Sequence, residues 1–256
     1  MVWCDKLAST PAVGFALDPH LAPTSSILAA LAPVLEEWVV RDTDKVEFTV
    51  DRTADPFSLQ ITSNTGFLYA ITHSRIWVEF IHKMKLRPTS GGPPIAELTS
   101  QPLPFTVLMR EISRRLIEAT MLLPNIGTRN VRRIGIVSTT VLDEATMPPG
   151  IARFVRYMSR PWQGAVENYQ FMIASELSRG SQSVDKCIHT VLKSDDAEQL
   201  PVLKFDWQRW FDPPSHPVRK ESITTLLRNA EDTAMTYFEE LAEGNRFDEN
   251  LLRSST

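Results

Sequence analysis

Short runs in which apolar and polar residues alternate constrain this chain more than any other feature of its sequence. Four such runs follow one another in the first half, at residues 46–51, 57–61, 67–71 and 76–84. A period of two puts successive side chains on opposite faces of a strand, so each run predicts a strand with one apolar face. The turn residues Asn64, Thr65 and Gly66 predict a hairpin within the series. Together the runs predict an antiparallel meander.

A second periodicity, with apolar residues three or four positions apart, predicts helices at 27–39, 104–123, 148–158 and 223–241. The last pattern is the clearest, because its apolar face extends from Ile223 to Leu241 and Gly244 follows as a cap. Pro33 predicts a kink in the first helix, and Pro161 predicts the end of the third. Further strands are predicted at 9–16, 131–141, 169–173, 184–192 and 202–207.

The elements occur in the same order twice: a strand, a helix, three or four antiparallel strands and a closing helix. The two halves cover residues 9–123 and 129–244 of a single globular unit, 1–256, and residues 245–256 are predicted to form a flexible tail. The predicted fold class is therefore α+β, an antiparallel sheet with helices packed on one face. In outline this is similar to a duplicated TATA-binding-protein-like or helix-grip arrangement, with a pseudo-twofold axis between the halves.

Residues 87–104 interrupt the pattern with five prolines and the adjacent Gly91 and Gly92. Proline removes backbone donors and glycine adds conformational freedom, so the segment 87–101 is predicted to be an irregular loop that proteases cut first. Two roles stay open for it. It is either a lid that reaches over the sheet or a slack connector.

Composition excludes several classes of protein. The 256 residues are 43% hydrophobic, and 31 acidic residues outnumber 27 basic ones, which argues against a chain that mainly coats phosphate backbones. The only cysteines, Cys4 and Cys187, form neither a disulfide framework nor a CxxC metal motif. A secretory signal and a membrane-length apolar run are both absent from the sequence. We therefore expect a cytoplasmic protein with no membrane partner and no cofactor.

The densest aromatic cluster supplies the predicted partner-binding residues, Arg209, Trp210 and Phe211. Leu203, Phe205 and Trp207 share strand parity and are expected to face the core, with the strand ending after Trp207. Trp and Arg dominate interface energetics, which favours partner contact for the residues beyond this point. The alternative is that Trp210 and Phe211 cap the edge of the sheet.

Arginines on two predicted helices form the second candidate surface. They are spaced to lie on exposed helix faces and comprise Arg153, Arg156 and Arg160 on one helix, with Arg110 and Arg114 on the preceding one. The planar guanidinium suits phosphate, so the ridge predicts binding of nucleic acid, a nucleotide or an acidic partner. The alternative is a solvated helical face balanced by Glu111 and Glu118.

Histidine and cysteine give the weakest signals. None of the five histidines falls in a metal-binding spacing, so no metal site is predicted. His73 and His82 lie on neighbouring predicted strands and could meet, although a hydrogen-bonded core histidine is the simpler interpretation of His82. Cys187 and His189 point to one face of a strand as a potential thiolate and base, or as two buried structural residues.

Three segments carry a family resemblance: Val131–Ile136, Leu203–Asp206 and Phe238–Leu241. They resemble a sporadically distributed family of uncharacterised bacterial proteins of about this length. The resemblance covers most of the chain. It implies a bacterial cytoplasmic protein and carries no established activity onto any residue.

Three functions follow as hypotheses, and the first is favoured. It is a non-enzymatic interaction protein that presents a sheet face or its helices to another protein or to a second copy, within a toxin-neutralising or phage-defence operon. The alternative is a nucleic-acid or nucleotide binder that uses the arginine ridge, whose affinity would fall steeply with salt. The third is a hydrolase or transferase with a cleft between the halves and a site drawn from His73, His82, Cys187 and His189.

Overall fold

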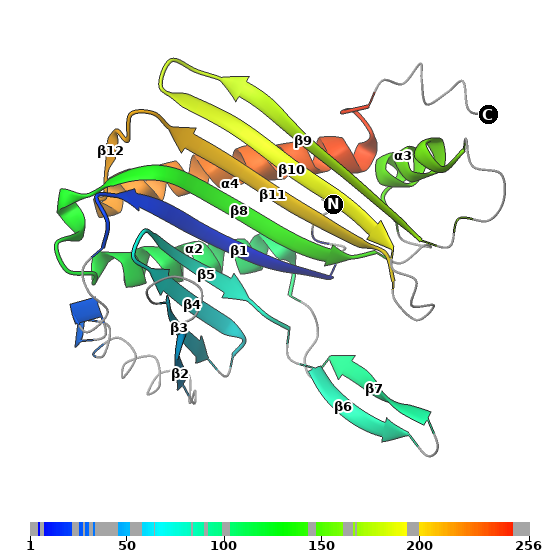
Figure 1. Cartoon of the computed structure of the whole chain (residues 1–256), viewed down its shortest axis with the longest axis horizontal. Helices are drawn as coiled ribbons and strands as arrows, with labels where there is room; N and C mark the ends of the chain where they lie inside the picture. Colours follow the sequence, from blue (N-terminus) through cyan, green and yellow to red (C-terminus); the bar gives the residue numbers. More distant parts are fainter. Residues whose placement is uncertain are drawn as a thin grey trace.

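One long antiparallel sheet organises the molecule (Figure 1). The computed structural model describes residues 5, 8–21, 26–27, 29–30, 33, 46–51, 58–63, 65–82, 84–89, 92–98, 103–142, 147–160, 166, 168–193 and 200–247. The strands of the sheet, in spatial order, are β2 (Val46–Asp51), β3 (Ser58–Ser63), β4 (Phe67–Thr72), β5 (Arg75–Phe80), β1 (Ala8–Asp18), β8 (Asn130–Val141), β11 (Val202–Phe211), β10 (Ser183–Lys193) and β9 (Tyr169–Arg179). The short β12 (His216–Pro217) pairs with one end of β8.

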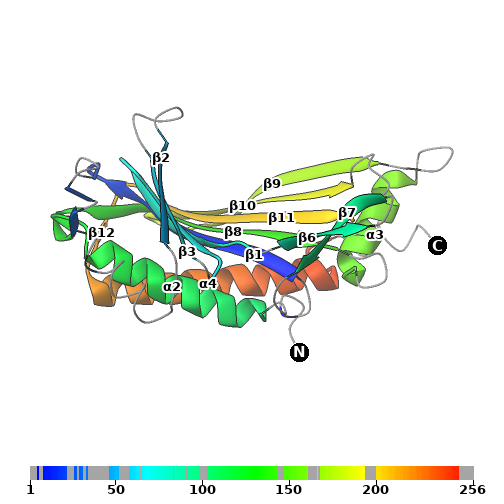
Figure 2. The ribbon, with the colours of Figure 1, turned by 90° about the horizontal axis from the view of Figure 1, so that it is seen from below.

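Helices cover one face of this sheet (Figure 2). Helix α2 (Phe105–Met121) packs against β1 and β5, and α4 (Lys220–Glu243) packs against β8 and β11. The shorter α3 (Pro149–Ser159) packs against α4, and the 3-10 turn η2 (Ile126–Thr128) precedes β8. Within the described part of the chain, no helix is long and apolar enough to cross a membrane. We call the side of the sheet away from α2 and α4 the open face.

The alternation seen in the sequence decides which side chains enter the core. On β8, Ile134 and Ile136 are buried beneath the helices, while Val137 points to the open face and is 40% exposed. The apolar stripe of α4 closes on the same strands, and the C-terminal Gly244 adopts a φ of 94° that ends the helix as predicted. The buried apolar residues of both halves belong to a single cluster. The predicted α+β class with an antiparallel sheet is confirmed.

The two halves meet at the β1–β8 pair in the middle of the sheet. In the first half β1 is followed outward by β5, β4, β3 and β2, and in the second half β8 is followed outward by β11, β10 and β9. The first strand of each half is therefore central, and the last strand of each meander lies beside it. The three antiparallel ladders β5–β1, β1–β8 and β8–β11 place the surface between the halves at the centre of the open face.

The prediction that residues 87–101 form an irregular loop is wrong, because most of these residues belong to strands. Residues Met84–Thr89 (β6) and Gly92–Leu98 (β7) form a two-stranded antiparallel hairpin that extends beyond the sheet instead of over it (Figure 1). Prolines fit here because Pro93 and Pro94 lie opposite a register shift and have no ladder partners, so their missing N–H groups break no ladder bond. Pro88 also lies where the register shifts. A lid over the open face is therefore not the geometry observed.

Two predicted strand ends were also wrong. β11 continues through Trp207 to Phe211, and β5 ends at Phe80, so that Met84 belongs to the hairpin. Most of the predicted helix at 27–39 and residues 248–256 of the predicted tail lie outside the described residues.

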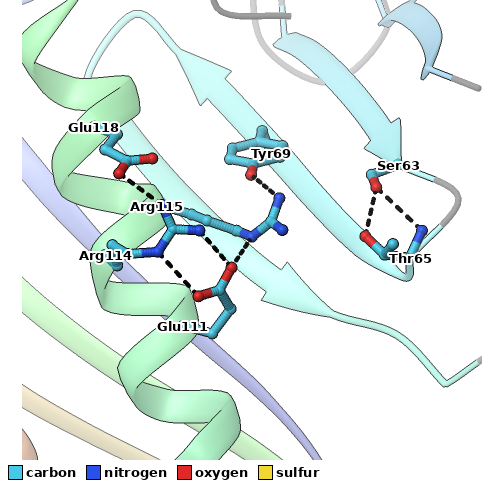
Figure 3. A network of polar contacts seen from close by, with 7 residues as sticks. All are labelled: Ser63, Thr65, Tyr69, Glu111, Arg114, Arg115 and Glu118. Carbon is cyan, nitrogen blue, oxygen red and sulfur yellow. Dashed lines mark hydrogen bonds and ion pairs between the residues drawn. The ribbon is translucent and has the colours of Figure 1, made fainter. Parts of the chain in front are cut away.

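A buried polar network attaches α2 to the meander (Figure 3). The Arg115 side chain is only 7% exposed; its Nε donates to Glu111 Oε1 at 2.6 Å and its Nη1 to the Tyr69 hydroxyl at 3.0 Å. Its guanidinium also lies 4.2 Å from the centre of the Phe67 ring. Burial raises the pKa of Tyr69 to about 12 although Arg115 opposes this shift. These contacts attach the meander to α2.

Candidate ligand-binding groove on the open face

The predicted partner-binding cluster is mostly structural. Phe211 is buried. Arg209 donates from Nε to Asp185 Oδ1 at 2.6 Å and from Nη2 to Asp185 Oδ2 at 2.7 Å, and Asp185 itself is only 4% exposed. Arg209 also lies over the Trp207 ring, with 5.2 Å to its centre. Because β11 continues to Phe211, these residues alternate between faces, and only Trp210 stays half-buried on the open face. The cluster therefore does not form one exposed patch.

The arginines predicted to form a basic ridge lie on two separate surfaces, one on α2 and one on α3. Figure 1 shows α3 near β9 and α2 beneath β1 and β5, so the arginines of the two helices lie apart. Arg153 donates to the carbonyl oxygen of Glu243 at 2.7 Å and so caps the end of α4. Arg114 is paired with Glu111 and Glu118, each at 2.6 Å. The alternative interpretation of a balanced helical face fits these contacts. Arg110, Arg156 and Arg160 remain exposed.

His73 and His82, whose contact the sequence left open, lie at opposite ends of β5. His73 lies in the turn before the strand and stacks on His20 with ring centres 4.9 Å apart. His82 follows the strand; its Nε2 is 3.1 Å from the backbone oxygen of Ser9, and its ring packs edge-on against Phe80. The two imidazoles therefore do not meet, because β5 runs between them, and the hydrogen bond of His82 fits the simpler interpretation of this residue.

The cysteine and histidine of β10 share one face, as predicted, but that face is the core. Burial, reinforced by the charge of Asp206, raises the pKa of the Cys187 thiol to about 12, so it stays protonated at neutral pH. Burial lowers the pKa of His189, and neither of its ring nitrogens has a hydrogen-bond partner among the described residues. Within those residues, no three His, Cys, Asp or Glu side chains gather as a metal site.

The open face instead holds a groove of about 390 Å³ between β5, β1, β8 and β11. Its floor is the cross-strand pair Gly14 and Gly135, which we call the glycine floor. Trp77 lies opposite Gly14 on the next strand and forms one wall, and Gln208 lies opposite Gly135 and forms the other. A Cβ built on Gly135 meets no atom within 4 Å, so the space above it is open.

Two arginines form the positive end of the groove. Arg75 on β5 and Arg133 on β8 pair with opposite sides of Ala16, which places their Cα atoms two strand spacings, about 10 Å, apart. Burial and the charge of Arg75 lower the pKa of Arg133, with Asp206 acting in the opposite direction. Among the described residues, neither guanidinium is in an ion pair, and Arg75 makes no side-chain hydrogen bond. Two cations therefore face one hollow, and no carboxylate of the described residues forms an ion pair with either of them.

A chain of hydrogen bonds on β11 holds Arg133 in place. Gln208 Oε1 accepts from Arg133 Nη1 at 3.2 Å and from Trp210 Nε1 at 3.0 Å, and Gln208 Nε2 donates to both carboxylate oxygens of Asp206. Arg133 also lies over the Trp210 ring at 4.8 Å from its centre. The orientation of this arginine is therefore set before any ligand arrives, which is the geometry that favours binding.

Carboxylates mark the other end, which we call the acidic end. Glu79 on β5 and Asp206 on β11 both belong to the row of residues that crosses the sheet through Ala12 and Val137. We call the row that contains Arg75, Ala16 and Arg133 the arginine row. The row with the carboxylates, the acidic row, lies four residues from it, about 13 Å along the strands. Burial raises the pKa of Glu79, and no described residue hydrogen-bonds to its carboxylate. The groove thus has opposite charges at its two ends.

Comparison with known proteins adds no relative: no family model, curated protein or solved structure matches this chain. The resemblance to a bacterial family and the cytoplasmic setting therefore stay predictions. None of the four candidate catalytic residues lines the groove, although it lies between the halves as the cleft hypothesis required. Sequence reasoning missed this groove. Its one available signal was an isolated glycine within each of two strands, at Gly14 and Gly135, which often marks a close approach of a ligand or backbone.

Proposed function

We propose that this protein is a non-enzymatic binding protein and that the groove on the open face binds a negatively charged ligand. The observation that carries the proposal is the pair Arg75 and Arg133, which face one hollow from two strands with no carboxylate bound to either among the described residues. Like charges held this close disfavour each other, and an anion between them removes the repulsion. A guanidinium also binds phosphate or carboxylate through two parallel hydrogen bonds.

The size of the groove supports a small ligand. Its volume of about 390 Å³ lies near the lower end of the roughly 300–1,000 Å³ typical of small-molecule sites. The rigid support also fits binding, because every lining residue belongs to a strand of the main sheet. This proposal keeps anion recognition by arginine, as the ridge hypothesis had it, but assigns it to different arginines.

Thermal unfolding in the presence of inorganic pyrophosphate tests the proposal at constant ionic strength. The melting temperature of the wild type should rise and saturate, because a ligand that binds only the folded state stabilises it by mass action. Arg75→Gln should abolish the rise, whereas Arg156→Gln, which changes an exposed arginine on α3, should retain it. An equal rise in both variants would refute the proposal.

A protein partner on the same face is the second candidate. Met172 on β9 is 66% exposed and Ile188 on β10 is 37% exposed, and the β9–β10 register makes them diagonal neighbours on the open face. Neighbouring exposed apolar side chains mark contact sites for proteins, and for this candidate we propose a second copy of the chain as the partner. Size-exclusion chromatography with light scattering should then show a dimer that Met172→Asp converts to a monomer. A wild-type monomer at high concentration would contradict this candidate.

A further inference from the structure

The polar groups of the groove specify more than a negative charge. A ligand that fills it must place an anion at the positive end, lie flat over the glycine floor and donate hydrogen bonds at the acidic end. Carboxylates accept hydrogen bonds but cannot donate them when ionised. The far end of the ligand therefore carries N–H or O–H groups, so a simple dicarboxylate or pyrophosphate would use the positive end only.

The glycine floor and the Trp77 wall determine which chemical group fits the middle of the groove. Where Gly14 and Gly135 pair, the open face lacks side chains over the width of two strands, and Trp77 stands beside the gap. A Cβ on Gly14 would lie 2.5 Å from the Cβ of Trp77, so this wall closes tightly on the floor. A flat ring fits this shallow gap, and a ring over the floor would meet the neighbouring indole edge to face, which is a favourable aromatic contact.

The distance between the positive end and the acidic end of the groove determines the length of the ligand. The arginine row and the acidic row are four residues apart, about 13 Å between Cα atoms, and the long arginine side chains shorten the distance that a ligand must span. A single planar ring with one anionic substituent is too short to use both ends. A ring joined to a phosphate through a sugar has the required length and order of groups.

We infer, on the basis of the proposed function, that the groove binds a nucleoside monophosphate, with its phosphate at the positive end, its base over the glycine floor and the amino group of the base at the acidic end. Glu79 lines the groove, and no described residue donates a hydrogen bond to its carboxylate, so the amino group of the base would supply its donor. The volume of the groove accommodates one nucleotide and not a strand of several.

Calorimetric titration with adenosine 5′-monophosphate, ribose 5-phosphate and adenosine tests the inference part by part. The nucleotide should bind one per chain and at least tenfold more tightly than either fragment. Arg75→Gln should weaken both phosphate compounds by about tenfold, as expected for a lost charged hydrogen bond, and leave adenosine unchanged. Glu79→Leu should weaken the nucleotide and adenosine and leave ribose 5-phosphate unchanged. Tryptophan fluorescence should change on binding because Trp77 lines the groove.

Two glycine variants separate occlusion of the groove from damage to the fold. A side chain at either Gly135 or Gly127 starts in open space, since a Cβ at each position meets no atom within 4 Å. Gly135→Leu fills the groove and should reduce nucleotide affinity more than tenfold with an unchanged melting temperature. Gly127→Leu, in the η2 turn, should bind as the wild type does. Equal binding by both variants would overturn the site.

The outcomes distinguish the inference from the proposed function. If the nucleotide binds no more tightly than ribose 5-phosphate and both depend on Arg75, the inference is wrong and the anion site stands. If Arg75→Gln leaves all affinities unchanged, both are wrong. If a single-stranded oligoadenylate binds more tightly than the mononucleotide at equal nucleotide concentration, the ligand is a nucleic acid and the inference of a free nucleotide is overturned.

Discussion

Replacing Arg115 with methionine removes the charge that joins α2 to the meander while keeping an unbranched apolar side chain. In the structure this guanidinium hydrogen-bonds to Glu111 and Tyr69 at 2.6 and 3.0 Å and lies 4.2 Å from the centre of the Phe67 ring (Figure 3). The side chain is 7% exposed, so water cannot replace these contacts without local opening. The variant tests how much of the stability of the first half depends on one buried charge.

The expected loss is about 3 kcal/mol. Each hydrogen bond to a charged group contributes about 1.5–3 kcal/mol, and the cation–π contact adds roughly 1 kcal/mol. The desolvation of the guanidinium opposes these gains and is absent in the methionine variant. The loss corresponds to a decrease in melting temperature of about 6–12 °C for a chain of this size.

Urea unfolding followed by circular dichroism measures the change, with a thermal melt as a second readout. The matched control is Arg114→Met, because Arg114 binds the same Glu111 at 2.6 Å but its side chain is 42% exposed. Exposed pairs contribute less than about 1 kcal/mol. If the two variants lose equal stability, or Arg115→Met loses less than 1 kcal/mol, burial does not have the role assigned to it.

The remaining predictions concern the other half and the centre of the sheet. Arg209→Ala should destabilise the fold by about 3 kcal/mol, measured by urea unfolding, because it leaves the buried Asp185 carboxylate unpaired; wild-type stability would restore the prediction that Arg209 is a free binding residue. His189→Leu should stabilise the protein by about 1 kcal/mol at pH 7, since both buried ring nitrogens lack partners among the described residues. Burial lowers the folded-state pKa of His189 below its unfolded value near 6.5, so wild-type stability should fall as pH drops below 6.5. The stability difference between the wild type and the leucine variant should then widen by up to about 1.4 kcal/mol per pH unit. A constant difference between pH 7 and 5 would contradict this. Gly14→Ala should lower stability by about 1–3 kcal/mol in the same assay because its methyl would lie 2.5 Å from Trp77 Cβ, and an unchanged midpoint would show that the strands relax.

Local pattern in the sequence determined the elements and the faces that they bury. Alternation predicted the strands and placed Leu203, Phe205 and Trp207 in the core, where they are 0%, 3% and 0% exposed. The 3.6-residue period predicted α2 and α4, and the order of elements predicted an antiparallel sheet with helices on one face. These features are readable because burial of one face repeats at a fixed interval along a helix or strand.

Errors arose where local composition conflicted with long-range pairing. The prolines of 87–101 indicated a loop, yet the register shift between β6 and β7 accommodates Pro88, Pro93 and Pro94 without loss of a ladder pair. The residues beyond Trp207 resembled an exposed strand end, yet pairing with β8 and β10 extends β11 to Phe211. In both cases a partner strand decided the outcome.

The groove was beyond the reach of the sequence for the same reason. Periodicity shows that Arg75 and Arg133 leave their strands on the polar side, but it contains no information on which strands are neighbours. Only the tertiary structure inserts β1 between β5 and β8 and sets the register that brings both arginines opposite Ala16. Strand order and register depend on the packing of the whole sheet against its helices, so residues 58 positions apart meet through contacts that no local pattern encodes.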